Sequence, residues 1–523
     1  MKIISAEQAA GIIESGWTVA SAGFVGCGHA EAVTAALERR FLETGAPRDL
    51  TLVYSAGQGD AKSRGANHFG FAGLTTRIIG GHWKSAPRLQ RLALSNQAAA
   101  YNLPQGIITQ LYRAIAGGKP GVITRIGLHT FVDPRHGGGR LNDAARQEPD
   151  SLVELIRVRG EEMLLYASFP IQCALLRGTT VDERGNITTE GEAFHHELLA
   201  IAQAAHNSGG IVIAQVKRQI ARHANPNLVR VPGILVDYAV ICEDPDDHWM
   251  TFAEAYNPTY TGEALLSNSP PPHLPLDARK IVQRRAVLEI AAKGPRVVNL
   301  GVGMPALVGL VAAEEGIDGF TMSVEAGPIG GLPAGGLSFG ASANPEAVID
   351  EPAQFDFYDG GGIDMAFLGF GELDVLGNVN VSMFGAGDST LIAGIGGFIN
   401  ITQSTRSLVF MGTLTAGGLK VAAGDGRLRI VSEGRHRKIV PSVGQLSFNG
   451  PYVAGLPGRD VLYITERAVF RMREGRLTLT EIAPGIDLQR DVIAQCAAAI
   501  ALDPDLKEMD ARLFRAAPMN LLE

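Results

Sequence analysis

One short pattern occurs in both halves of the chain, and this repeat constrains the fold more than any other feature. An amphipathic helix is followed by an apolar strand and then by a glycine-rich loop, an order typical of α/β domains. The three elements are expected over residues 5–15, 17–22 and 23–28 in the first half, and over 278–293, 296–300 and 301–305 in the second. A pattern that recurs in this way predicts two related α/β units.

A second shared pattern supports this duplication. Residues 180–187 and 373–379 each place an Asp-x-x-Gly-Asn turn between apolar residues, which favours a β-hairpin. An apolar strand is expected further along each half, at 210–214 and 407–411. Two patterns in the same order indicate that the halves are built alike.

The predicted fold class is α/β, with two similar open α/β domains in tandem, each a mainly parallel sheet flanked by helices. Short continuous apolar runs at 211–216, 239–242 and 365–368 are typical of parallel strands covered on both faces. Proline is poorly tolerated in helices and central strands, so the proline-rich stretch is predicted to be a linker. The expected boundaries are an N-terminal domain over 1–266, a linker over 267–275 and a C-terminal domain over 276–523. Residues 487–502 have helical periodicity and are expected to form a helix.

Composition argues against several classes of partner. The formal net charge is −8, and a mildly acidic protein without a Lys/Arg-rich face is a poor candidate for nucleic-acid binding, so no nucleic-acid partner is expected. The four cysteines are widely separated without metal-binding spacing, which indicates reduced thiols. The first residues lack the apolar core of a signal peptide, and no apolar run is long enough to span a membrane. We therefore expect a cytoplasmic protein without a membrane partner.

Glu325 is the carboxylate best placed for chemistry. An apolar strand over 319–322 leads to it, and a segment rich in glycine over 326–331 follows. Ligands of open α/β sheets bind at the carboxyl ends of strands, and a carboxylate can act as a covalent nucleophile. Spacing alone leaves open that Glu325 caps a turn or pairs with an arginine.

Two glycine-rich segments are candidate binding loops. Amides of the loop 301–305 could bind a phosphate at a helix start, although the loop lacks both the third glycine of a dinucleotide fingerprint and the lysine of a Walker A loop. Amides within 384–398 could donate to an oxyanion. A tight turn and a surface loop are the respective alternatives. Residues 195–197 lack zinc-helix spacing and are expected to be a solvated helix start.

Together these segments resemble the family I CoA-transferases, most closely the acetate/propionate (short-chain acyl-CoA) group, over nearly the whole chain. The family signature Ser-x-Glu-x-Gly is matched by Ser323, Glu325 and Gly327. Val324 and Ala326 depart from the Ser-Glu-Asn-Gly form of succinyl-CoA:3-ketoacid transferases. The resemblance implies an α-subunit-like half fused to a β-subunit-like half that carries the catalytic glutamate, and the departure favours short-chain substrates.

The resemblance also implies roles for individual residues. Glu325 would be the nucleophile. The acyl oxygen would be held by Gln105, Gly396 and Gly397, and CoA would be bound by Gly301, Val302, Gly303 and Gly394. CoA would pass from a short-chain acyl-CoA (acetyl, propionyl or butyryl type) to a free short-chain carboxylate by a ping-pong mechanism through a glutamyl-CoA thioester.

Thioester energy is conserved in such an exchange, so no metal and no tightly bound cofactor are expected. Coenzyme A would serve as substrate, product and covalent thioester, and the resemblance implies a homo-oligomer, either a tetramer or a dimer. Two related alternatives use the same glutamate: an acyl-CoA hydrolase and a succinyl-CoA:3-ketoacid CoA-transferase. A non-catalytic sensor of a phosphorylated metabolite belongs to a different class and would tolerate loss of Glu325.

Overall fold

The computed structural model describes residues 1–221, 226–267, 274–385 and 387–521. Most of the predicted linker, residues 268–273, lies outside them. Contacts along the chain define two compact units. The first comprises Met1–Leu266, Val324–Asp359 and Gly385–Asn400, and the second comprises Ser267–Ser323, Gly360–Phe384 and Ile401–Glu523. The segment that carries Glu325 therefore packs with the first unit.

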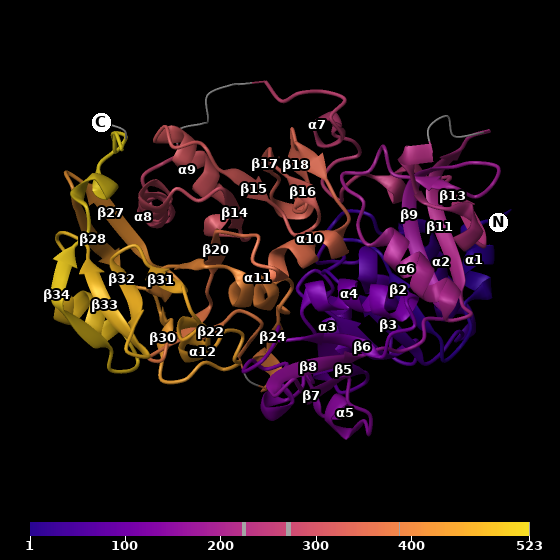
Figure 1. Cartoon of the computed structure of the whole chain (residues 1–523), viewed down its shortest axis with the longest axis horizontal. Helices are drawn as coiled ribbons and strands as arrows, with labels where there is room; N and C mark the ends of the chain where they lie inside the picture. Colours follow the sequence, from indigo (N-terminus) through magenta and orange to yellow (C-terminus); the bar gives the residue numbers. More distant parts are fainter. Residues whose placement is uncertain (222–225, 268–273, 386, 522–523) are drawn as a thin grey trace. The chain divides into compact units, whose positions relative to one another are not determined.

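A parallel sheet forms the centre of the first unit (Figure 1). Its strand order is β1-β13-β11-β9-β2-β3-β4-β5, and all neighbours in this order run parallel. The apolar sequence explains the arrangement, because every residue of β9 is buried. The bounds are β1 Lys2–Ile3, β2 Thr18–Ser21, β3 Leu50–Tyr54, β4 Thr75–Gly80, β5 Ala99–Asn102, β9 Cys173–Val181, β11 Ile211–Gln219 and β13 Tyr238–Ile241.

Helices of the first unit bury their apolar faces, and α4 packs against both α6 and α10. In α4 the apolar residues Ile107, Ile108 and Leu111 recur at helical spacing and are all buried. The helices are α1 Ala6–Ile12, α2 Glu31–Thr44, α3 Pro87–Leu94, α4 Gln105–Ala116, α5 Asp143–Gln147, α6 Leu198–Asn207, α7 Pro258–Thr261 and α10 Glu351–Asp359.

The second unit contains a mixed sheet in the order β15-β14-β20-β25-β31-β32-β33-β34. Neighbours from β15 to β31 are parallel, β32 and β33 pair antiparallel, and β34 is parallel to β33. Its core includes Val298, Phe367 and Val409. The bounds are α8 Ala278–Lys293, β14 Val297–Leu300, α9 Val308–Glu314, β15 Thr321–Ser323, β20 Met365–Gly369, β25 Ser407–Met411, α12 Gly450–Ala454, β31 Asp460–Ile464, β32 Ala468–Arg473, β33 Arg476–Ile482 and β34 Ala501–Glu508.

Smaller strand pairs decorate both units. In the first they are β6 Gly121–Thr124 and β7 Val153–Val158 on β8 Glu161–Ala167, β10 Ile187–Thr188 with β12 Val229–Val231, β16 Pro328–Ile329 with β19 Ala347–Val348, and β17 Leu332–Pro333 with β18 Ser342–Ala343. In the second they are β22 Val379–Asn380 and β30 Ile439–Val440 on β21 Glu372–Asp374, β26 Thr415–Ala416 with β29 His436–Arg437, and β27 Lys420–Gly424 with β28 Arg427–Ser432.

The predicted α/β class is confirmed, and so are several of its elements. Both Asp-x-x-Gly-Asn segments form antiparallel hairpins, β9 with β10 and β21 with β22. The expected helix over 487–502 is wrong. This stretch contains only two short helical turns, Leu488–Val492 and Ile493–Gln495, and then enters β34. Ala501 and Leu502 at the end of this stretch pair with β33, and such tertiary contacts override the helical preference of the alanines.

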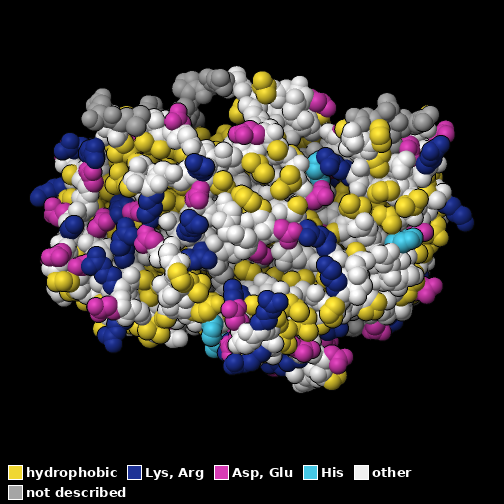
Figure 2. Space-filling view, viewed as in Figure 1, with side chains coloured by type: hydrophobic (Ala, Val, Ile, Leu, Met, Phe, Trp, Pro, Cys, Tyr) yellow, Lys and Arg dark blue, Asp and Glu magenta, His cyan; other side chains and the backbone are white. Residues whose placement is uncertain are grey.

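Positive and negative side chains are intermixed on the face shown in Figure 2, with no large area of one sign. This distribution is unlike the basic stripe of a nucleic-acid-binding surface. Among the helices in the described ranges, none combines the length and apolarity needed to cross a membrane.

Candidate active site

Glu325 lies in a tight turn that follows β15. The Val324 amide donates to the Pro328 carbonyl at 3.0 Å, and the Gly327 amide donates to the Val324 carbonyl at 3.0 Å. The Gln354 side chain donates to the same Val324 carbonyl at 3.1 Å. These bonds fix the backbone on both sides of the half-buried Glu325 side chain.

The residues on either side of Glu325 anchor this turn in an apolar cluster. Val324 is 4% exposed and Ala326 is fully buried, and both belong to a cluster that includes Phe24 and Phe339. Their side chains are therefore committed to packing. The sequence suggested that these two positions favour short-chain substrates. Because both side chains are buried in the cluster, such an effect would not arise from direct contact with a substrate.

Gly327 is required by geometry. Its φ is 126°, which side chains rarely adopt, and a Cβ atom there would lie 2.1 Å from the Ile349 carbonyl oxygen. The Ile349 amide donates to the Gly327 carbonyl at 3.1 Å, so the two backbone segments cannot separate without losing this bond. The glycine of the Ser-x-Glu-x-Gly signature thus permits the close approach that positions Glu325.

A Gly327→Ala substitution is expected to displace the turn. We expect it to destabilise the protein by about 2–4 kcal/mol and to lower kcat/KM by about 100-fold, because the backbone is strained and the Glu325 side chain is displaced. Thermal unfolding and a transfer assay measure the two effects. Gly335→Ala is the matched control, since Gly335 lies in the same segment with nothing within 4 Å of its Cβ position. Equal Tm and activity in both variants would contradict this role of Gly327.

Three helices of the first unit begin at one place and bring three polar side chains together. Gln105 is the first residue of α4, Glu197 is the N-cap of α6, and Glu351 is the first residue of α10. Gln105 Nε2 donates to Glu351 Oε1 at 2.7 Å. Ser55 Oγ donates to Glu197 Oε1 at 2.6 Å. Gln105 and both glutamates are at most 2% exposed.

Burial dominates the electrostatics of these two carboxyl groups. It raises the pKa of Glu197 to about 7. It also raises the pKa of Glu351 well above its usual range, and the negative charges of Glu197 and Glu325 add to that rise. The charge of Glu325 therefore acts on Glu351, which accepts the hydrogen bond from Gln105, and all three residues belong to the first unit.

The glycine segment predicted to hold the acyl oxygen lies against the start of α4. The backbone N–H of Gln105 donates to the Gly396 carbonyl at 2.9 Å, and the backbone N–H of Gly396 donates to the Gly81 carbonyl at 2.8 Å. Gly394 forms an antiparallel bridge with His82. The fold of the first unit thus brings together Gln105, Gly394, Gly396 and, next in sequence, Gly397. The Gly396 N–H is already bonded to the Gly81 carbonyl and is not available to an acyl oxygen. Gly396 instead supports Gln105, because its carbonyl accepts from the Gln105 backbone N–H.

In the second unit, the loop Gly301 to Gly303 follows the carboxyl end of β14. The Gly301 amide donates to the Phe367 carbonyl at 2.8 Å, and Gly303 has a φ of 86°. Val302 is 65% exposed. The loop leads through the turn Pro305–Leu307 into α9. Its position at a strand end and its exposure suit a ligand-binding loop.

A polar connection supports the start of α4 from the other side. The Gly106 amide donates to Asn400 Oδ1 at 3.2 Å, and Asn400 Nδ2 donates to both carboxyl oxygens of Asp359, at 3.0 and 3.1 Å. A Cβ atom on Gly106 would lie 2.4 Å from the Phe355 ring. The absence of a side chain at Gly106, the residue after Gln105, therefore lets α4 pack closely on α10, which places Gln105 against Glu351.

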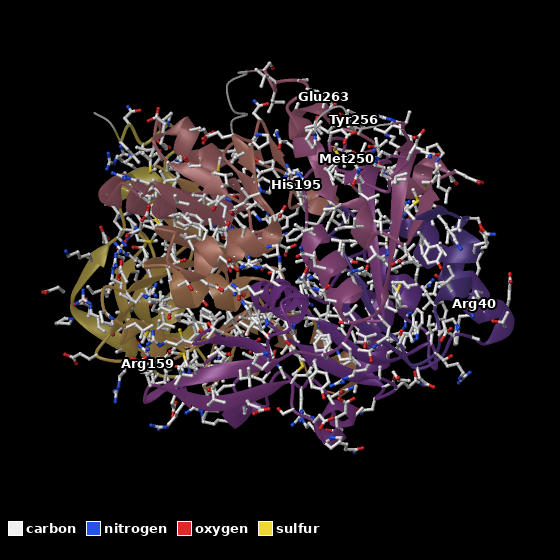
Figure 3. All side chains as sticks on the ribbon, turned by 45° about the vertical axis from the view of Figure 1, so that its right-hand side comes forward. Arg40, Arg159, His195, Met250, Tyr256 and Glu263 are labelled. Carbon is white, nitrogen blue, oxygen red and sulfur yellow. The ribbon has the colours of Figure 1, made fainter. Side chains whose placement is uncertain are left out.

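Sequence reasoning missed the two buried glutamates and Ser55. Glu351 and Ser55 carry no motif that would identify them. The expectation of a solvated helix start at residues 195–197 is wrong, since His196 and Glu197 are buried; only His195, labelled in Figure 3, is half-buried, where it bonds to Thr189 at 2.8 Å. The sequence did contain a signal for the burial of Glu197. This residue directly precedes the apolar residues 198–202, and a helix that begins with such a run packs its first turn against the core.

Comparisons with known proteins agree with this geometry. Residues 3–241 match the family described as Coenzyme A transferase. Caffeate CoA-transferase from Acetobacterium woodii is 46% identical over 518 residues, which cover 98% of this chain and 97% of that protein. Acetate CoA-transferase YdiF from Escherichia coli strain K12 is 42% identical over 524 residues, which cover 99% of this chain and 96% of that protein.

Solved structures extend the similarity to three dimensions. The acyl-CoA transferase YdiF apoenzyme from Escherichia coli O157:H7 superimposes with a TM-score of 0.92 at 40% identity, covering 99% of this chain and 97% of that chain. The same enzyme, described as a thioester complex with CoA, gives a TM-score of 0.91 with the same coverage. The similarity therefore spans both units.

Proposed function

The chain belongs to the coenzyme A transferase family and transfers coenzyme A between an acyl-CoA and a carboxylate, and we propose that Glu325 carries the coenzyme as a thioester. The observation that supports this assignment most strongly is the setting of Glu325. It lies in a turn fixed by hydrogen bonds and apolar packing, close to the Gln105–Glu351 contact. The YdiF structure described as a thioester complex with CoA supports a covalent intermediate.

The proposed reaction has two symmetrical halves. The Glu325 carboxylate attacks the acyl-CoA carbonyl and expels CoA thiolate, which leaves a mixed anhydride. The thiolate then attacks the Glu325 side-chain carbonyl and releases the first acid as its carboxylate. The resulting glutamyl-CoA thioester reacts with a second carboxylate through the same steps in reverse. Ping-pong kinetics follow from this order.

Each step passes through an oxyanion that needs hydrogen-bond donors. Gln105 Nε2 carries two hydrogens, of which Glu351 accepts one, so we assign the second to the acyl oxygen. The Gly397 amide is the proposed second donor, with Gly396 holding the backbone of Gln105. The backbone of Gly301, Val302, Gly303 and Gly394 is proposed to bind coenzyme A.

We assign short-chain acyl-CoA donors and carboxylate acceptors to this site, a choice supported by the 42% identity to an acetate CoA-transferase. The more similar relative is named for caffeate, so competition between acetate and caffeate as acceptors decides the preference. The proposal includes a cytoplasmic homo-oligomer, tetramer or dimer, without a metal. It also includes an α-subunit-like half over 1–266 and a β-subunit-like half over 276–523.

Borohydride trapping tests the thioester directly. The protein is mixed with acetyl-CoA and then treated with borohydride, which reduces a glutamyl thioester to an alcohol. Peptide mass analysis is expected to locate the alcohol at Glu325. Release of free thiol, followed without an added acceptor, distinguishes transfer from hydrolysis, because a hydrolase continues to release thiol. An unmodified Glu325 in an enzyme that still transfers CoA would overturn the assignment.

A further inference from the structure

Two buried carboxyl groups, Glu197 and Glu351, lie together at the starts of α6 and α10, and the charge of Glu325 acts on Glu351. Glu197 is 1% exposed and Glu351 is fully buried. Throughout the described ranges, no lysine, arginine or histidine forms an ion pair with either. The contrast is Glu192, also buried, which pairs with Arg177 at 2.5 Å and with His248 at 3.2 Å. An unbalanced pair of buried carboxylates is strongly unfavourable.

The hydrogen bonds show where a proton can reside. Glu197 Oε1 accepts from Ser55, and Glu351 Oε1 accepts from Gln105. Within the described part of the chain, no N–H or O–H group donates to the remaining oxygens, Glu197 Oε2 and Glu351 Oε2, and both are buried. The two side chains are in hydrogen-bonding contact, so a proton shared between these two oxygens satisfies both of them. It also leaves Glu351 Oε1 as the carbonyl oxygen of a neutral acid, which accepts from Gln105 as observed.

We propose that Glu351 is held as a neutral carboxylic acid by a hydrogen bond to the Glu197 carboxylate, and that this carboxyl pair is a positioning device for Gln105. The inference rests on the proposed role of Gln105 in the transfer reaction. The carboxyl pair fixes the side-chain amide of Gln105. One Nε2 hydrogen is bonded to Glu351, so the other is directed away from Glu351. A neutral Glu351 also spares Glu325 and an incoming substrate carboxylate from a neighbouring negative charge.

The direction of the pKa shifts agrees with this assignment of the proton. Burial raises the pKa of both groups, and the contact between them lowers the pKa of Glu197 while raising that of Glu351. Glu351 is therefore the acid and Glu197 the anion. The other titratable groups facing the carboxyl pair are Glu325, which raises the pKa of Glu351, and the buried phenol of Tyr112, whose own pKa is raised by burial and by both glutamates.

The histidine and the tyrosine next in sequence to the residues of this cluster carry no positive charge. Burial lowers the pKa of His196, the neighbour of Glu197, to about 3, so its ring is neutral. Burial raises the pKa of Asp350, the neighbour of Glu351, and the positive charges of Arg230 and Arg113 partly offset that rise. Burial also raises the pKa of Tyr54, which precedes Ser55. Since the two arginine charges act on Asp350, and none of the described cations forms an ion pair with Glu197 or Glu351, a proton is what neutralises the carboxyl pair.

The consequence is a loss of transfer at alkaline pH. When the Glu351 O–H releases its proton to solvent, a second carboxylate forms beside Glu197 and close to Glu325. This charge repels the substrate carboxylate, so kcat/KM for the acceptor acid falls as pH rises above neutral. The sign follows from the raised pKa of Glu351: the protonated, active form persists at neutral pH and is lost only above it.

Amide substitutions separate the two carboxyl groups. In Glu351→Gln the amide reproduces the neutral acid, since its N–H donates to Glu197 and its oxygen accepts from Gln105. We expect kcat/KM at neutral pH within about tenfold of wild type and no alkaline fall, because no proton remains to be lost. In Glu197→Gln the new amide donates to Glu351 and favours its carboxylate. We expect kcat/KM to be lower by about 100-fold at neutral pH, with the alkaline fall beginning at lower pH.

The test is a set of pH profiles of kcat/KM for the acceptor carboxylate between about pH 6 and pH 10. Glu346→Gln, exposed on the same segment, is the matched control and should follow the wild-type profile. Infrared difference spectra of wild type minus Glu351→Gln at neutral pH provide a second readout, with a protonated carboxyl band expected in the wild type. The proposal is overturned if Glu351→Gln keeps the alkaline fall, if it loses more activity than Glu197→Gln, or if the difference spectrum lacks the protonated carboxyl band of the wild type.

Failure of this proposal is distinguishable from failure of the proposed function. Borohydride trapping in the wild type reports on the Glu325 thioester whatever the protonation of Glu351. Labelled Glu325 together with unshifted pH profiles refutes only the carboxyl pair, whereas unlabelled Glu325 in an active enzyme refutes the thioester itself. If Glu351→Gln does not fold, the shift of the alkaline fall in Glu197→Gln still decides the matter.

Discussion

In a Glu325→Gln variant, kcat for CoA transfer is expected to fall by about 10⁴-fold or more, because removal of a covalent nucleophile leaves only binding and oxyanion stabilisation. The amide keeps the size of the side chain, and the turn around it is held by backbone bonds and by Val324 and Ala326. We therefore expect little change in Tm. Acyl exchange between acetyl-CoA and labelled acetate measures the loss, since it requires only the first half of the reaction and its reversal.

Glu346→Gln again serves as the control, because Glu346 is an exposed glutamate on the same segment. Its exchange rate should match the wild type. The Glu325→Gln preparation must also be checked by peptide mass, since deamidation would restore the glutamate. Exchange within tenfold of wild type in a variant free of glutamate at this position would exclude a covalent role for Glu325.

The sequence predicted the parts of this protein that depend on local pattern. Apolar runs identified three parallel strands of the first unit, β2, β11 and β13, and the helix Ala278–Lys293 was predicted with its observed bounds. Glu325 was chosen as the candidate nucleophile because its strand-end position and Ser-x-Glu-x-Gly setting are both visible in the sequence. The backbone bonds and the close contact at Gly327 explain why that spacing is needed.

The parts that depend on distant contacts could not be predicted. Glu197 and Glu351 are 351 − 197 = 154 positions apart in the sequence. Each is an acidic residue at the start of a helix, which is a common and uninformative position. Only the packing of α4 against α6 and α10 brings them together. The same reason explains the error at 487–502, where pairing with β33 outweighs local helical preference. The segment of Glu325 likewise joins the first unit through contacts that no linear boundary records.

The Gln105→Ala variant tests the second part of the mechanism. Loss of one oxyanion donor typically costs about 10²- to 10³-fold in kcat, and we expect a loss of this size with a smaller change in KM, because the charge on the acyl oxygen develops only in the transition state. Truncation also removes the hydrogen bond to Glu351, so Tm should fall modestly. Steady-state transfer kinetics and thermal unfolding measure the two effects.

The appropriate control is Gln97→Ala, because Gln97 is an exposed glutamine of the first unit, in the turn between α3 and β5. Its kcat and Tm should remain those of the wild type. A Gln105→Ala enzyme that keeps its kcat while its KM rises would show that Gln105 binds the substrate equally in the ground state and the transition state. In that case the Gly397 amide and other donors must stabilise the oxyanion, and the carboxyl pair of Glu197 and Glu351 would orient a binding group instead of a catalytic one.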